Sequence, residues 1–112
     1  MARPLWKVKF VEHWVNDLRL NEWTIKWKEV NGEPMGRTEA IAATRYFPLY
    51  REAFIEIQKG RSRQNWKRDM LHELLHLRFP IIKKLYHEDD ERFEVGMEVM
   101  ARILLGEFKG GG

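Results

Sequence analysis

Hydrophobic positions near the N-terminus follow a helical period. The apolar residues of this segment recur mostly every three or four positions: Trp6, Val8, Phe10, Val11, Trp14, Val15 and Leu18. This spacing predicts an amphipathic helix over about residues 4–20, and Pro4 suits its first turn. Three of these residues, Trp6, Val8 and Phe10, also alternate, so a strand over residues 5–10 is the competing interpretation.

The middle of the chain changes to the two-residue period of strands. Apolar and polar side chains alternate in Trp23-Thr24-Ile25-Lys26-Trp27-Lys28, which predicts a half-buried strand. A turn is expected at residues 31–36, where Asn, Gly and Pro are concentrated. Residues 37–46 are weakly strand-like. Residues 51–58 alternate clearly and predict another strand, which ends at Lys59-Gly60-Arg61.

Two further helices are expected after the strands. Ser62 is a suitable N-cap for a helix to about Arg78, and Pro80 should prevent its continuation. The pair Asp89-Asp90 can cap a last helix that runs to about Glu107. The order of helix, three strands and two helices predicts an α+β fold with a sheet of about three strands.

Composition limits the class of protein. The chain has 112 residues, 33% of them charged, and no cysteine, with a net charge of +3. This length fits a single domain over residues 1–112, with a flexible tail from about residue 106. We expect no membrane span, because no run of about 18 apolar residues occurs. The lack of cysteine and of a signal-peptide core favours a cytoplasmic protein. The small charge excess does not favour a nucleic-acid partner.

The sequence His72-Glu73-Leu74-Leu75-His76 is an H-E-x-x-H motif within the second predicted helix. Two histidines one helical turn apart lie on the same face, so both imidazoles can bind one zinc ion. Glu73 can then reach a water at the open position of the metal and act as general base. Trp66, Met70, Leu74 and Leu77 form an apolar stripe on one face of this helix, so the motif residues His72, Glu73 and His76 fall on a different face.

A zinc site needs a third protein ligand. On a helical wheel with about 100° per residue, Glu94 falls between Ala101 and Leu105, beside the apolar stripe of the last helix. The central stripe is predicted from these residues: Phe93, Met97, Met100 and Leu104. A carboxylate within an apolar face is costly unless it is paired or bound to a metal, so Glu94 is the preferred ligand. His87 is the alternative.

Glu98 follows Glu94 by one helical turn. It borders the same face and can accept a hydrogen bond from a ligating histidine.

The motif on one helix and Glu94-x-x-x-Glu98 on a later helix resemble the gluzincins, zinc metallopeptidases with a glutamate as third ligand. The length and the order of elements are similar to those of minigluzincins, which are very small zincin domains. The resemblance covers about residues 20–105, and only the H-E-x-x-H part is specific. It implies a peptide or protein substrate, with Zn²⁺ as the cofactor.

Some positions depart from related families. Phe93 stands where thermolysin-like enzymes carry an asparagine before the ligand glutamate. SprT-like proteases have a later H-G-x-x-F motif, whose spacing His87 and Phe93 do not match. Some small zincins use a third histidine, which keeps His87 as an alternative ligand.

The expected activity is hydrolysis of peptide bonds. Glu73 would take a proton from the zinc-activated water and pass it to the leaving amine, and Tyr86 or His87 is a candidate donor to the oxyanion. A substrate would lie along an exposed sheet edge, formed by residues 37–46 or 51–58.

Two other functions remain open at this point. The chain can be a latent or non-catalytic zinc-binding domain, with residues 108–112 in the cleft. It can also be a basic adaptor without metal that grips nucleic acid or protein through a cluster near the second helix. That cluster consists of Lys59, Arg61, Arg63, Lys67 and Arg68.

Overall fold

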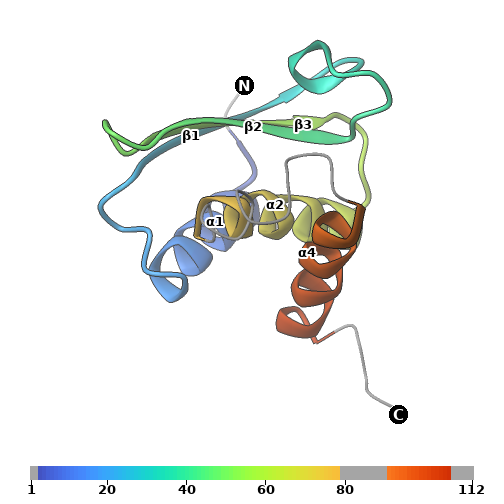
Figure 1. The fold of residues 1–112 in the computed structure, drawn as a ribbon. Coiled ribbons are helices and arrows are strands. Elements are labelled where there is room, and N and C mark those ends of the chain that lie inside the picture. Colours follow the sequence, from blue (N-terminus) through green and yellow to red (C-terminus); the bar gives the residue numbers. More distant parts are fainter. Residues whose placement is uncertain (1–2, 79–90, 107–112) are drawn as a thin grey trace.

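The computed structural model describes residues 3–78 and 91–106, and the side chains of residues 91–95 lie outside this description. It shows a small α+β domain (Figure 1). The elements, in chain order, are α1 (Leu5–Asp17), β1 (Thr24–Val30), the short 3₁₀ helix η1 (Pro34–Gly36), β2 (Ala42–Phe47), β3 (Glu52–Gln58), α2 (Arg63–Arg78) and α4 (Glu91–Leu104).

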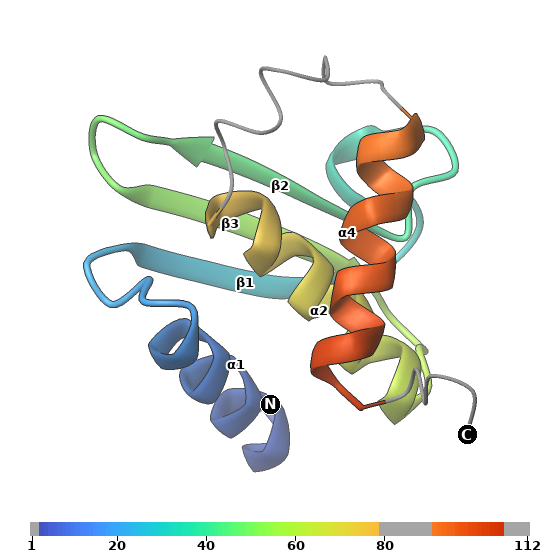
Figure 2. The same cartoon turned by 60° about the horizontal axis from the view of Figure 1, so that its bottom comes forward.

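The three strands form one mixed sheet in the order β1-β3-β2. β3 runs parallel to β1 and antiparallel to β2. The helices α1, α2 and α4 lie on the same side of this sheet (Figure 1). Seen from the side of the helices, α2 lies in front of the strands and α4 crosses beside it (Figure 2). The expectation of an exposed edge is wrong for residues 51–58, because β3 is central, whereas residues 37–46 contain most of β2, which lies at an edge of the described sheet.

The main core lies between the sheet, α1 and α2. Trp66 of α2 is fully buried, and its ring makes edge contacts with Trp6, Phe10 and Trp27 at centroid distances of 5.2, 5.8 and 5.4 Å. From β3, the alternate residues Ala53, Ile55 and Ile57 face this core and are at most 1% exposed. The alternation of strand residues in the sequence is therefore the alternation of the two faces of the sheet.

A second group of buried residues joins α2 to α4. It contains Leu71 and Leu75 of α2 with Met97 and Ala101 of α4. The central stripe predicted for the last helix is partly wrong, since Leu104 is 41% exposed. The buried face is centred on Met97 and Ala101 instead, because α4 contacts α2 along this line.

Most element predictions are confirmed. The segment after Pro4 is a helix, so the competing strand over residues 5–10 is wrong. Ser62 accepts a hydrogen bond from the backbone N–H of Asn65 at 3.2 Å and thus caps α2 as expected. Helix α4 ends before Glu107, and Gly106 has the left-handed φ of 74° with which helices commonly terminate. Pro80 and the Asp89-Asp90 pair lie outside the described residues.

Membrane crossing can be judged for the described helices. None of the helices within residues 3–78 and 91–106 is long and apolar enough to span a bilayer, in agreement with the expectation from the sequence.

Candidate metal site

Helix α2 brings the three residues of the H-E-x-x-H motif together. His72, Glu73 and His76 each offer a ligand atom, and these atoms lie within 4.8 Å of one another. The two imidazole rings are 4.8 Å apart between centroids and inclined at 59°. Their closeness follows from the spacing of four residues, which places both rings on one face of the helix. Glu73 and His76 are each only 7% exposed, so the group is largely removed from water.

Glu98 of α4 fixes the orientation of the His72 ring. Its Oε2 lies 3.1 Å from His72 Nδ1, and a carboxylate at this position makes Nδ1 the protonated nitrogen. Nε2 of His72 then carries the lone pair that a metal would take.

Two arginines lie beside the other carboxylate oxygen of Glu98. Oε1 of Glu98 faces Arg102 Nε at 3.5 Å and Arg68 Nε at 3.8 Å. One oxygen is thus directed to cations and the other to the imidazole. From the sequence, Glu98 was expected to accept a hydrogen bond from a histidine of the motif. The structure contains this contact, with His72.

Glu73 is tied to the sheet. Thr44 of β2 donates its hydroxyl to Glu73 Oε1 at 2.7 Å, and Thr44 is 8% exposed. The second oxygen, Oε2, lies 4.0 Å from His72 Nε2. One oxygen of the carboxylate therefore accepts from a strand hydroxyl, and the other faces Nε2 of His72. Thr44 was missed by the sequence analysis, because nothing in the local pattern relates it to a residue 29 positions away.

An ion pair supports the same helix one turn before the motif. Arg61 Nε donates to Asp69 Oδ2 at 2.9 Å. Burial raises the pKa of Asp69 above its ordinary value of 3.8, and the hydrogen bond and charge of Arg61 oppose this rise. The segment entering α2 is thereby fixed to the helix face that neighbours the histidines.

The candidate third ligands lie outside the described side chains. Glu94 belongs to α4, but its side chain lies outside the described part of the structure. His87 and Tyr86 lie outside the described residues altogether. The structure thus brings together His72, Glu73, His76 and Glu98, and the choice between Glu94 and His87 stays a prediction.

Four members of the basic cluster at the start of α2 have partners within the protein. Arg61 pairs with Asp69, and Arg68 contacts Asn65 and Glu98. Arg63 lies 4.7 Å and Lys67 6.0 Å from the Trp6 ring centroid. These cations contribute to the fold, which weakens the case for this cluster as a nucleic-acid grip.

Comparisons with protein-family models, with curated proteins and with solved structures give no match for this chain. The chemistry must therefore be argued from the side chains. Two imidazoles one helical turn apart, with the Glu73 carboxylate beside them, are donor types that a metal ion such as zinc takes. The orientation of His72 by Glu98 is also typical of metal-binding histidines. The group formed by His72, Glu73 and His76 could hold a metal ion.

Proposed function

We propose that this protein is a zinc-dependent peptidase. In this proposal His72, His76 and Glu94 hold the metal, and Glu73 is the general base. The observation that carries it is the convergence of His72, Glu73 and His76 on one face of α2, with one imidazole oriented by Glu98. Zinc would place a positive charge beside the carboxylate of Glu73, which is only 7% exposed.

The chemistry divides between the metal and the chain. Bound zinc would supply a Lewis acid that lowers the pKa of a water molecule towards neutrality. Glu73 would accept the proton on Oε2, since Thr44 donates to Oε1. Rotation of the carboxylate is restricted by the same hydrogen bond, so Oε2 stays on the side of His72 Nε2. Glu73 would then return the proton to the leaving amine.

The place of Glu94 along α4 supports its role as the third ligand. It precedes Met97 by three residues and Ala101 by seven, and both of these are buried in the contact between α4 and α2. Spacings of three and seven residues keep positions on one face of a helix. A ligand from α4 would also explain why this helix contributes Glu98 to His72.

The substrate is proposed to bind along β2. One side of this strand pairs with β3, and no described strand pairs with its other side. An extended peptide can add to such an edge through backbone hydrogen bonds. Thr44 belongs to β2 and touches Glu73, so a peptide on this edge would pass close to the general base.

The experiment is a measurement of zinc content in the purified protein, together with cleavage of a peptide library. We expect about one zinc per chain and cleavage that a chelator abolishes. His76→Ala should lose the metal and the activity, whereas His13→Ala, an exposed histidine on α1, should keep both. Stable zinc without cleavage would indicate a non-catalytic zinc-binding domain. Absence of zinc at neutral pH would overturn the metal site.

A further inference from the structure

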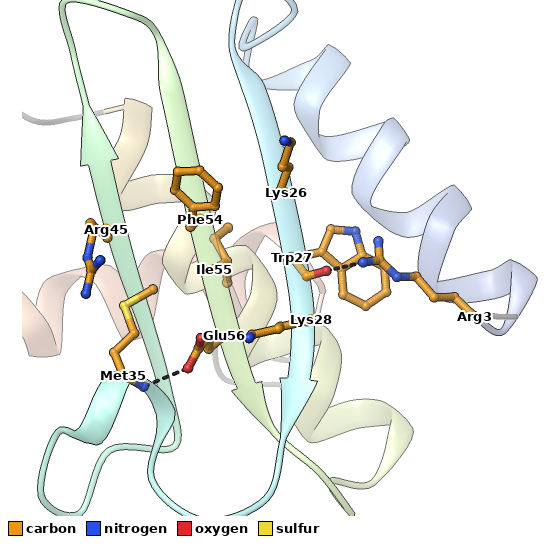
Figure 3. Close-up of a pocket in the computed structure, with 9 residues that line it drawn as sticks. All are labelled: Arg3, Lys26, Trp27, Lys28, Met35, Arg45, Phe54, Ile55 and Glu56. Atoms are coloured by element: carbon orange, nitrogen blue, oxygen red, sulfur yellow. Dashed lines mark hydrogen bonds and ion pairs between the residues drawn. The ribbon is translucent and has the colours of Figure 1, made fainter. Parts of the chain in front are cut away.

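On the face of the sheet opposite α1, α2 and α4, a row of side chains across the three strands alternates between cationic and aromatic residues. We call this side the outer face. Lys26 of β1 and Arg45 of β2 are both register partners of Phe54 on the central strand. Phe54 is therefore flanked by a cation on each side (Figure 3). The Lys26 ammonium lies 6.0 Å from the Phe54 ring centroid, so the cation and the ring share one surface.

This row borders a groove of about 430 Å³. Its charged lining residues are Arg3, Lys26, Lys28, Arg45 and Glu56. Glu56 is already engaged, because it accepts the backbone N–H of Met35 at 2.8 Å and faces Lys28 at 3.6 Å. Lys28 pairs with Glu56 and Arg3 donates to the Trp27 carbonyl, so the positive charge of the groove that its lining carboxylate does not offset lies on Lys26 and Arg45. The small net charge of the whole chain conceals this local excess.

Aromatic surface continues from the row towards the hairpin that joins β2 to β3. Phe47 stacks edge-on against Phe54 with centroids 6.3 Å apart, and these side chains are 41% and 37% exposed. Tyr50 in the turn is 76% exposed. The helices α1, α2 and α4 lie on the other side of the sheet (Figure 1), whereas the short helix η1 contacts this face, where the backbone N–H of Met35 binds Glu56. Exposed aromatic rings grouped in this way mark a binding surface more often than an isolated apolar residue does.

We propose that the outer face binds single-stranded nucleic acid. Bases would stack on Phe54 and Phe47, and phosphates would lie against Lys26 and Arg45 on either side. The combination of a cationic groove with aromatic side chains is what sequence-tolerant binding of single strands requires. This site lies on the opposite side of the sheet from His72 and His76, and the proposal does not depend on the peptidase activity.

Charge alone would also attract an acidic polypeptide, but the exposed rings favour nucleic acid. Carboxylate chains offer no flat surface to stack on Phe54, whereas every base does. The effect of removing the Phe54 ring on binding therefore distinguishes nucleic acid from an acidic polypeptide.

The test is binding of a fluorescein-labelled 15-nucleotide oligothymidylate, followed by fluorescence anisotropy at several salt concentrations. Lys26→Glu and Arg45→Glu should each weaken binding about tenfold or more. Each should also flatten the logarithmic salt dependence by about 0.7, the value for one lost phosphate contact on a single strand. Lys9→Glu, an equal charge change on exposed α1, should change the affinity less than about twofold.

Phe54→Ala should weaken binding about tenfold through lost stacking, and Phe54→Trp should restore it. Leu5→Ala removes an exposed apolar side chain elsewhere and should have no effect. His76→Ala should bind the oligonucleotide as the wild type does, whatever its zinc content. The proposal is overturned if the wild type fails to bind at low salt, or if Lys9→Glu weakens binding as much as Lys26→Glu. It is also overturned if a polyglutamate peptide competes equally and Phe54→Ala has no effect.

Discussion

The hydroxyl of Thr44 and the carboxylate of Glu73 form a buried 2.7 Å hydrogen bond between the sheet and helix α2. Thr44 faces inward from β2, and Glu73 rises from the helix that carries both histidines. Each of these residues is less than 10% exposed. A carboxylate this far from water needs donors, and Thr44 supplies one while it fixes the direction of the other oxygen.

Replacement of Thr44 by valine should therefore affect both stability and activity. The buried carboxylate would lose a donor, and the free energy of unfolding of the metal-free protein should fall by about 1–3 kcal/mol. In the proposed zinc peptidase, kcat should fall about tenfold with the zinc content unchanged. Denaturant unfolding and steady-state kinetics measure the two effects. Thr44→Ser keeps the hydroxyl and should restore both; a serine variant as impaired as the valine variant would contradict this role.

Glu73→Gln tests the general base directly. The amide is close in size to the carboxylate but cannot accept the proton, so hydrolysis should fall by at least about 100-fold. The fold and the zinc content should be retained, which circular dichroism and metal analysis can show. Unchanged cleavage of the peptide library would exclude Glu73 as the base. Loss of zinc in this variant would instead identify Glu73 as a ligand.

The third ligand is tested by comparing Glu94→Ala with His87→Ala. If Glu94 binds the metal, its removal should lower zinc affinity strongly, because two imidazoles alone hold zinc poorly. The melting temperature should then fall more with zinc present than with chelator, since bound metal stabilises only the folded state. His87→Ala should do neither. The reverse pattern would assign the third position to His87.

Glu98→Ala should weaken zinc binding about 10- to 100-fold, the usual cost of losing the partner of a ligating histidine. The reason is the 3.1 Å contact with His72 Nδ1, which orients the ring. Competition with a fluorescent zinc chelator measures the affinity. Glu12→Ala on exposed α1 is the matched control and should bind zinc like the wild type. Equal zinc affinity in the Glu98 variant would show that the contact does not support the metal.

Asp69 should change how the free energy of unfolding depends on pH. Burial raises its pKa above 3.8, so the folded state binds a proton more readily than the unfolded state does. Its contribution to stability is therefore present at low pH and is lost as the pH rises through the folded pKa. Asp69→Asn removes this term, and the decline of stability on acidification above about pH 4 should become steeper than in the wild type.

Thermal unfolding of the chelated protein between pH 3.5 and 6.5 measures this effect. The asparagine can still accept from Arg61, so the geometry of the pair is largely kept. A shallower acid decline in Asp69→Asn would show that the charge of Arg61 outweighs burial at this carboxyl.

The sequence by itself determined the features that depend on neighbours along the chain. The alternation of Ala53, Ile55 and Ile57 predicted the strand that the structure contains, and the spacing of Trp66, Met70 and Leu74 predicted the buried face of α2. His72 and His76 lie together because four residues make about one helical turn. These relationships follow from the geometry of single elements, so they can be predicted from short stretches of the sequence.

Only the tertiary structure decided which elements meet. The strand order places β3 between β1 and β2, and this order brings Lys26 and Arg45 to either side of Phe54. The same packing brings Thr44 to Glu73 and Glu98 to His72, across 29 and 26 residues of chain. Neither strand order nor the line of contact between helices is set by local periodicity. Both are set by which apolar faces bury one another best, and that depends on the whole chain at once.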